Sequence, residues 1–150
     1  MKNSYLLSLT FLFCGFLLWG QTASEWYDKG KNAYEYEKYE NAIIYFTKAI
    51  EQKFSPLEWA YNDRGYVKSE LGLYEKAIED FDKAIDLNES FANPFYHRGF
   101  ARVRLGILLS AKEDYKRAIL TDPNYTEAKN NLGRINKKLQ AQSYFTTAAK

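Results

Sequence analysis

Few side chains in this 150-residue sequence could support catalysis or bind a metal ion. His97 is the only histidine and Cys14 is the only cysteine. A zinc site needs several nitrogen or sulfur ligands, and covalent catalysis needs a nucleophile beside a base. One histidine and one distant cysteine provide neither arrangement. The sequence therefore predicts no metal site and no cofactor.

Two pairs of adjacent acids have the residue type that acid–base catalysis requires, Glu79-Asp80 and Glu113-Asp114. Both pairs occur at the same offset of a repeated segment, on predicted helices away from the expected binding face. We interpret all four as solvated surface residues. No Gly-rich phosphate loop and no nucleophile–base pair accompanies them. The sequence therefore predicts a protein that is not an enzyme.

The most informative pattern is an internal repeat. The segment Tyr61–Ile85 returns as Phe95–Ile119, 34 residues later, with nine of 25 positions identical. Apolar and small residues recur inside each unit at spacings of three and four, which is typical of amphipathic helices. A Leu-Gly pair divides each unit, and Gly72 and Gly106 are expected to end the first helix in a left-handed conformation. Each unit is therefore predicted to be two antiparallel helices.

Small residues in the repeat predict close packing of the two helices. Gly65 on the first helix faces Ala77 and Ala84 on the second, and Phe81 is expected to fill the space left beside them. Because glycine inside a helix costs about 1 kcal/mol relative to alanine, its repetition indicates a packing role.

The same frame extends in both directions. An earlier unit covers Trp26–Ile50, and Ser55-Pro56 is expected to begin the next helix, with Ser55 and Glu58 forming a capping box. Asn93-Pro94 is expected to begin the third unit similarly. The predicted boundaries are repeats at about 23–56, 58–91 and 92–125, a polar capping helix at 126–141 and a tail at 142–150, so the domain covers 21–141.

A 34-residue helix-turn-helix unit with this frame resembles the tetratricopeptide repeat (TPR) family. The resemblance covers residue 23 to about residue 139 and implies an all-α fold, a right-handed solenoid of antiparallel helix pairs. The positions that match the family signature are Gly30, Ala42, Phe46, Ala49, Gly65, Ala77, Phe81, Ala84, Gly99, Ala111, Tyr115, Ala118 and, once only, Pro123.

The resemblance also implies peptide or protein binding on a concave face lined by the first helix of each unit. His97 is interpreted as a hydrogen-bonding group there. The implied groove residues are Tyr27, Asp28, Lys31, Tyr34, Trp59, Asn62, Asp63, Tyr66, Asn93, Tyr96, His97, Phe100, Asn130, Asn131 and Arg134.

Two departures from the family pattern qualify this expectation. Basic residues stand beside the repeated glycines, notably Arg64 and Arg98, and are expected either to loosen the contacts between units or to form salt links across them. One subfamily of these repeat proteins binds the C-terminal carboxylate of a peptide with Lys, Asn and Arg side chains, an arrangement called a carboxylate clamp. The five corresponding positions here are Tyr27, Lys31, Asp63, Asn93 and His97, so we expect that clamp to be absent.

The first 20 residues predict an export signal. One lysine precedes an apolar run from Leu6 to Trp19, which is shorter than the ~20 residues that a membrane-spanning helix needs. Cleavage after Gly20 is our interpretation, and an uncleaved membrane anchor is the alternative. The expected location is the periplasm or the secreted space.

Charge is unevenly distributed along the chain. Residues 21–90 hold 9 basic and 15 acidic residues, and residues 91–150 hold 11 basic and 4 acidic ones. The polarity suggests head-to-tail self-association or the steering of a dipolar partner, with drift in surface composition as the alternative. The predicted function is a scaffold or adaptor that binds a protein or peptide of unknown identity. A nucleic-acid-binding helical repeat using the basic half, or a self-associating assembly subunit, remains the alternative.

Overall fold

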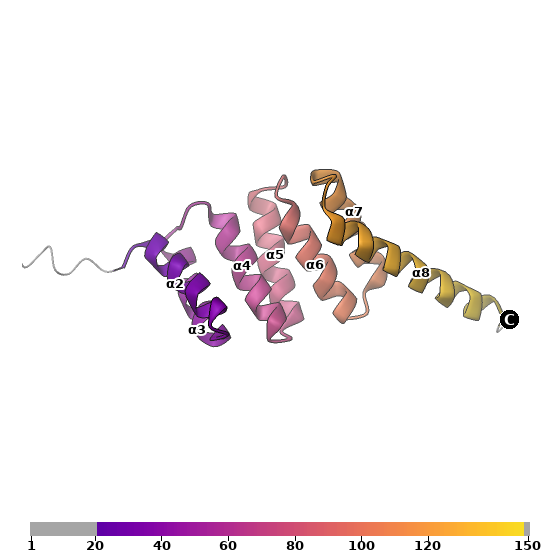
Figure 1. Ribbon diagram of the computed structural model, residues 1–150, viewed down its shortest axis with the longest axis horizontal. Helices are drawn as coiled ribbons and strands as arrows, with labels where there is room; N and C mark the ends of the chain where they lie inside the picture. The colour runs from indigo at the N-terminus through magenta and orange to yellow at the C-terminus, as the bar shows by residue number, and fades with distance from the viewer. Residues whose placement is uncertain (1–20, 149–150) are drawn as a thin grey trace, which may run out of the picture.

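The computed structural model describes residues 21–148, with side chains as far as Ser143, and in this range it contains helices and no strands. The helices stand side by side in chain order, and the last extends away from the row (Figure 1). They are α2 (Ala23–Glu35), α3 (Tyr39–Glu51), α4 (Leu57–Glu70), α5 (Tyr74–Leu87), α6 (Ala92–Arg104), α7 (Leu108–Thr121) and α8 (Thr126–Ala148). The predicted all-α fold, a solenoid of antiparallel helix pairs, is confirmed.

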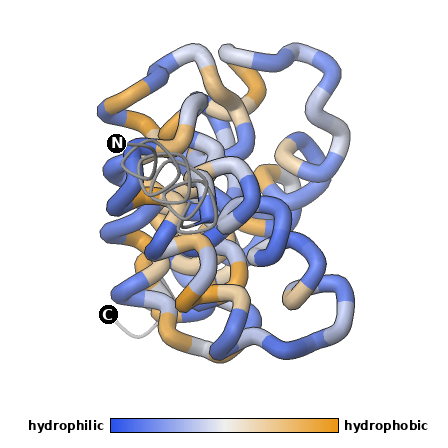
Figure 2. Tube along the Cα trace, turned by 90° about the vertical axis from the view of Figure 1, so that its left-hand side faces the viewer, coloured by the Kyte–Doolittle hydropathy of each residue, from blue (hydrophilic) through white to orange (hydrophobic). Residues whose placement is uncertain are grey.

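Amphipathic packing holds the row together. Hydrophobic and hydrophilic segments alternate along the helices (Figure 2), and each helix packs against the next in the chain. α4 also contacts α6, so the first helices of successive repeats touch. This arrangement brings the first helices together on one side, where the sequence places the groove.

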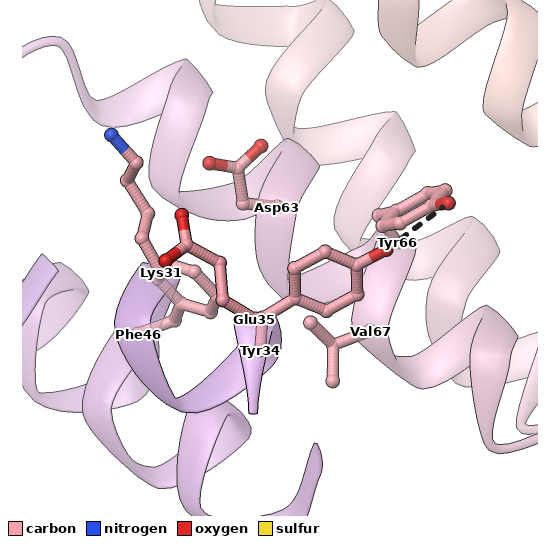
Figure 3. Close-up of a pocket in the computed structure, with 7 residues that line it drawn as sticks. All are labelled: Lys31, Tyr34, Glu35, Phe46, Asp63, Tyr66 and Val67. Carbon is pink, nitrogen blue, oxygen red and sulfur yellow. Dashed lines mark hydrogen bonds between the residues drawn. The ribbon is translucent and has the colours of Figure 1, made fainter. Parts of the chain in front are cut away.

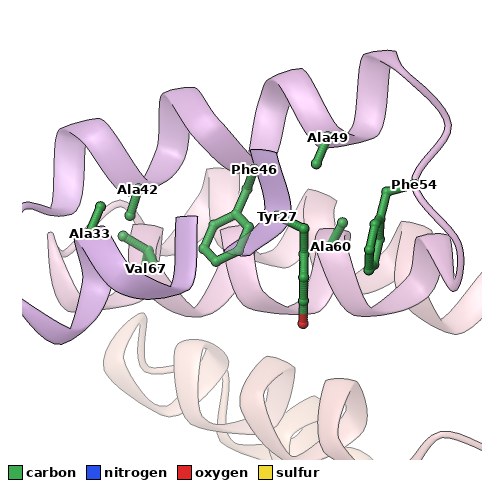
Figure 4. Packing of buried hydrophobic residues seen from close by; sticks show 8 residues of the cluster. All are labelled: Tyr27, Ala33, Ala42, Phe46, Ala49, Phe54, Ala60 and Val67. Carbon is green, nitrogen blue, oxygen red and sulfur yellow. The ribbon is translucent and has the colours of Figure 1, made fainter. Parts of the chain in front are cut away.

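The glycines inside the first helices allow each pair to pack closely. A Cβ atom on Gly30, Gly65 or Gly99 would lie 2.6, 2.8 or 2.9 Å from a ring atom of the aromatic residue opposite. Real Cβ atoms do not approach other atoms so closely, so these positions accept only glycine without rearrangement. Phe46, one of those aromatic residues, lies within the buried cluster that the first repeat forms with α4 (Figure 4). The predicted packing role is confirmed.

The turns between paired helices share one backbone conformation. Gly72 and Gly106 have φ values of +74° and +77°, as expected for left-handed helix stops. Glu37 occupies the equivalent position of the first repeat with φ 56°, although its side chain disfavours that conformation. The turn geometry is therefore repeated even where the sequence lacks glycine.

Two predicted helix starts are wrong. α4 begins after Pro56 with no side-chain cap, and the Glu58 carboxylate accepts a hydrogen bond from Asn88 Nδ2 at 3.1 Å instead of capping its own helix. α6 begins at Ala92, with Phe91 as its N-cap, so that Asn93 already lies inside the helix. A capping box occurs instead at the start of α2, where Thr22 and Glu25 exchange hydrogen bonds of 3.2 and 2.8 Å.

The interpretation of both acid pairs as solvated surface is wrong for their second members. Asp80 and Asp114 are each 3% exposed, whereas Glu79 and Glu113 are exposed. Adjacent residues on a helix point about 100° apart, so one member of each pair faces the neighbouring helix while the other faces solvent.

Each buried aspartate binds two cations. Arg64 Nη2 and Lys68 Nζ both lie 2.7 Å from the Asp80 carboxylate, and Arg98 Nη2 and Arg102 Nη1 both lie 2.7 Å from that of Asp114. The basic residues beside the glycines therefore support the helix pairs by burying their charge in ion pairs.

The same arginines also link successive repeats. Arg64 Nη1 donates a 3.0 Å hydrogen bond to Thr47 of the first repeat, and Arg98 Nη1 lies 2.6 Å from Asp82 of the second. Of the two alternatives offered by the sequence, salt links across the units are the one observed.

The final helix is longer than predicted. α8 continues to Ala148, beyond the expected boundary near Ala141, because residues 142–148 contain no glycine or proline to end it. Ala128 and Ile135 are buried against the third repeat. A Cβ on Gly133 would meet nothing within 4 Å, so this glycine keeps the repeat spacing but has no packing partner.

Candidate functional site

A pocket opens between the first helices of the first and second repeats. Its volume is about 290 Å³. α2 and α4 provide most of the lining, and Phe46 of α3 contributes its buried ring. The residues that line it are Lys31, Tyr34, Glu35, Phe46, Asp63, Tyr66 and Val67 (Figure 3).

Asp63 is held at the edge of this pocket by hydrogen bonds from two neutral donors. The Tyr27 hydroxyl donates to Asp63 Oδ2 at 2.5 Å, and Asn62 Nδ2 donates to Asp63 Oδ1 at 3.0 Å. Burial raises the pKa of Asp63, while these two hydrogen bonds and the charge of Lys31 act in the opposite direction. Burial, and then the hydrogen bond to Asp63, also raise the pKa of Tyr27. The two side chains therefore form a fixed polar pair that joins the first two repeats.

A row of aromatic rings continues from this pocket across the first helices. Tyr34 contacts Tyr66 with ring centroids 5.5 Å apart, and Tyr66 contacts His97 at 4.9 Å. His97 contacts Tyr96 at 5.3 Å, and Tyr96 contacts Tyr125, just before α8, at 4.9 Å. We call these five side chains the aromatic row. Because they come from all three repeats and the start of the cap, the row runs the length of the predicted groove.

Hydrogen bonds between side chains hold three rings of the aromatic row, those of Tyr34, Tyr66 and Tyr96. The Tyr34 hydroxyl donates to the Tyr66 hydroxyl at 3.4 Å, and this bond, followed by burial, raises the pKa of Tyr66. Asn131 Nδ2 of α8 donates to the Tyr96 hydroxyl at 3.3 Å. The row is therefore organised before any ligand binds.

His97 lies in the middle of the aromatic row as a packing residue. Its ring stacks on Phe81 with centroids 5.7 Å apart and also contacts Tyr66 and Tyr96. Burial lowers its pKa to about 4, so the ring is neutral at pH 7. A neutral imidazole remains able to form hydrogen bonds but contributes no positive charge to the groove.

The other predicted groove residues divide by exposure. Tyr27 and Asn62 are buried, at 8% and 4% exposure, and act from beneath the surface by holding Asp63. Trp59 is 48% exposed and Phe100 is 36% exposed, and both lie outside the pocket. The remaining predicted residues that are exposed are Asp28, Lys31, Asn93, Asn130 and Arg134.

Four residues of the site were not predicted as groove residues, and one of them, Phe46, was predicted only as part of the structural repeat signature. Glu35 and Val67 line the pocket, and Tyr125 ends the aromatic row. Glu35 and Val67 each lie next in sequence to a pocket tyrosine, Tyr34 or Tyr66. That adjacency is the signal that could have found them.

Residues 21–148 contain no cluster of three or more His, Cys, Asp or Glu side chains able to hold a metal ion. Over the same range, no helix is both long and apolar enough to cross a membrane. The predicted export signal lies outside the described residues.

Comparison with known proteins gives consistent results. Residues 24–55 match the family described as tetratricopeptide repeat, and residues 65–106 match the family described as TPR repeat. Among curated proteins, the chain is 31% identical over 121 residues to heat shock protein STI1 of Saccharomyces cerevisiae, an alignment that covers 81% of this chain. The chain spans only 12 to 20% of the length of the curated relatives it matches.

Two solved structures are similar over most of their length. The first TPR of Spaghetti (RPAP3), bound to the HSP90 peptide SRMEEVD, is 31% identical with a TM-score of 0.76, covering 80% of this chain and 94% of that one. The second TPR domain of human RPAP3, in complex with the HSP70 peptide SGPTIEEVD, is 31% identical with a TM-score of 0.69, covering 73% and 90%.

Proposed function

Because this chain belongs to the tetratricopeptide repeat family, we propose that it is a non-catalytic adaptor that holds a peptide or protein segment along its first helices. The observation that carries the proposal is the pocket between α2 and α4, which continues into the aromatic row. Tyrosine side chains offer large contact areas and hydrogen-bonding hydroxyls at low entropic cost, which suits them to peptide recognition. The related domains that hold chaperone peptides support the same class of function.

The ligand is expected to differ from the acidic C-termini held by those domains. A carboxylate clamp needs cations, and of the five clamp positions only Lys31 carries a positive charge at pH 7. Asp63, a half-buried acid, stands where the clamp has a neutral amide. A peptide such as SRMEEVD would place its terminal carboxylate near this acid. We therefore expect this chain to bind that peptide weakly or not at all.

We also propose that the protein works outside the cytoplasm, in the cell envelope or the exported space. The support for this location is the sequence of residues 1–20, with its short basic start and apolar run. Mass determination of the N-terminus after expression in the source cell tests it. A mature chain that begins near Gln21 supports export with cleavage, and an intact Met1 contradicts cleavage.

A pull-down with two matched triple variants tests the groove itself. The groove variant changes Trp59, Tyr66 and Phe100 to alanine. The control variant changes three exposed apolar residues outside the pocket, Tyr36, Leu109 and Leu120, to alanine. Circular dichroism first establishes that both fold.

A partner retained by the parent and the control variant but lost by the groove variant supports the proposal. If all three proteins retain the same partner, another face carries recognition and the proposal is wrong.

A further inference from the structure

Asp63 differs from the two buried aspartates in its partners. Asp80 and Asp114 each lie within 2.7 Å of two cationic nitrogens. Asp63 accepts hydrogen bonds only from the neutral groups of Tyr27 and Asn62, and no ion pair reaches it from any residue in the range 21–148. A carboxylate withdrawn from water without a counter-ion is unfavourable unless something else supplies the positive charge.

Lys31, the basic residue beside Asp63 in the pocket, does not act as its counter-ion. Lys31 Nζ lies over the ring of Tyr27, 5.9 Å from its centroid, and forms no ion pair with Asp63. Burial still raises the pKa of Asp63 despite the charge of Lys31 and the two hydrogen bonds. The carboxylate therefore remains short of positive charge in the free protein.

The rest of the pocket suits a long side chain with a cationic end. Tyr34 and Tyr66 expose part of their rings to a methylene chain, which a basic side chain can bury while its head group stays polar, and the buried side chains of Phe46 and Val67 complete the apolar lining. Tyr34 and Tyr66 present aromatic rings, which attract cations placed over their faces. Glu35 adds a second acid, so the lining carries two acids and one base (Figure 3).

We propose that this pocket receives a basic side chain, arginine or lysine, of the bound peptide, with Asp63 as its counter-ion. The proposal rests on the peptide-binding function proposed above and names the residue class that the first pocket selects. It reverses the charge preference of a carboxylate clamp at the same place on the fold. The free amino terminus of a peptide has the same charge but lacks the long methylene chain, so it is a separate outcome of the test.

Selection from a random dodecapeptide phage library, with the full-length chain as bait, provides the probes. Peptides that bind the parent but not the Tyr66→Ala variant are synthesised. We expect each to contain an essential arginine or lysine. Replacing arginine by citrulline, or lysine by norleucine, should weaken binding by about 10- to 100-fold, as expected for loss of a charge-assisted contact. Acetylation of the peptide amino terminus should have no effect.

Asp63→Asn tests the counter-ion directly by isothermal titration calorimetry with the same peptides. We expect a similar loss, about 10- to 100-fold, because asparagine keeps the shape but not the charge. Glu79→Gln, which removes an exposed acid outside the pocket, is the matched control and should leave affinity unchanged.

Thermal unfolding of the free protein gives a second readout, which separates a binding role from a structural one. Asp63→Asn removes an unpaired half-buried charge and should raise the Tm by about 3–5 °C. The Asn62 amide can rotate to accommodate the change, because its Oδ1 atom has no hydrogen-bond partner within the described residues. Asp80→Asn leaves Arg64 and Lys68 without their shared carboxylate and should lower the Tm. A Tm that falls equally in both variants means that Asp63 is structural, and overturns the proposal.

The outcomes distinguish this proposal from the function beneath it. If no selected peptide depends on Tyr66, the peptide-binding function itself fails. If peptides depend on Tyr66 but contain no essential basic residue, or bind Asp63→Asn as tightly as the parent, only the present proposal fails. Peptides that lose affinity on acetylation alone identify an amino terminus as the ligand and overturn the side-chain assignment.

Discussion

Asp114 is a buried acid with Arg98 and Arg102 on its two carboxylate oxygens. Removing its charge takes this carboxylate from two partly buried guanidinium groups, of which Arg98 keeps only its ion pair with Asp82. We therefore expect Asp114→Asn to lower the free energy of unfolding by about 3 kcal/mol, measured by urea denaturation. Glu79→Gln is the control, and as an exposed acid it should change that free energy by no more than about 0.5 kcal/mol. Equal effects of the two changes would contradict the buried ion-pair assignment.

His97 predicts a pH dependence of stability. The unfolded chain binds a proton on this imidazole near pH 6.5, whereas the folded protein resists protonation until about pH 4, because burial lowers the pKa. The free energy of unfolding should therefore fall as the pH is lowered through that window. His97→Phe keeps an aromatic ring among Tyr66, Tyr96 and Phe81 but cannot titrate, so its stability should fall less.

The comparison between variant and parent is the decisive quantity in this experiment. Because the pKa of Asp63 is raised in the folded protein, its contribution to the free energy of unfolding increases as the pH falls, whereas that of His97 decreases. The parent profile alone combines both contributions. Identical pH profiles for the parent and His97→Phe would show that the imidazole is not desolvated in the folded state.

The sequence predicted features that depend on the spacing of the repeat, but not features that depend on which side chains pair with one another. The glycine positions follow from the 34-residue repeat, and their close contacts are confirmed. The burial of Asp80 and Asp114 was missed because each acid was considered without the arginine 16 residues before it. Arg64 precedes Asp80, and Arg98 precedes Asp114, by that same interval. The repeated Arg–Asp spacing is the signal that predicts a buried ion pair.

At the scale of the helices, two glycines in equivalent repeat positions should respond oppositely to alanine. A Cβ on Gly65 would lie 2.8 Å from the Phe81 ring and 3.1 Å from the Ala77 carbonyl oxygen, which is backbone and cannot easily move. We expect Gly65→Ala to destabilise the protein by about 1–3 kcal/mol through overpacking. Gly133→Ala meets nothing within 4 Å and should stabilise the protein by up to about 1 kcal/mol through helix propensity.

Differential scanning calorimetry of the two variants checks this prediction. The pair is its own control, since the substitution and the helical context are the same and only the neighbour differs. A destabilising Gly133→Ala would mean that α8 has a partner at that position.

Helix existence was easier to predict than helix ends. Apolar spacing over the repeats fixes which residues face the partner helix, and that pattern is long and regular. A helix cap depends on a single residue. The sequence could not show whether Ser55 caps α4 or belongs to an extended connection that ends at Pro56. The end of α8 was missed because the repeat frame stops there while helix formation does not. The groove positions came from the family frame, while the pocket itself depends on contacts between repeats that spacing does not describe.

For the whole molecule, the uneven charge supports a hypothesis of head-to-tail association. The acidic first two repeats and the basic third repeat with α8 form opposite ends of the row (Figure 1). Light scattering at low salt should give a mass above that of the monomer, and the mass should fall as salt screens the charges. A monomer mass at every salt concentration rules the association out. Filter binding of single-stranded RNA at low salt separates this hypothesis from a nucleic-acid-binding role for the basic half.

The position of the pocket between two repeats has a thermodynamic consequence. In a solenoid each repeat contacts chiefly its neighbours. The stability of the protein is therefore close to a sum of the stabilities of the single repeats and of one coupling energy for each adjacent pair. A ligand held by α2 and α4 contacts the first two repeats at once and increases the coupling energy of that pair only. Occupied protein should therefore open from its C-terminal end. Hydrogen exchange would detect ligand binding as a change in the order in which the repeats unfold.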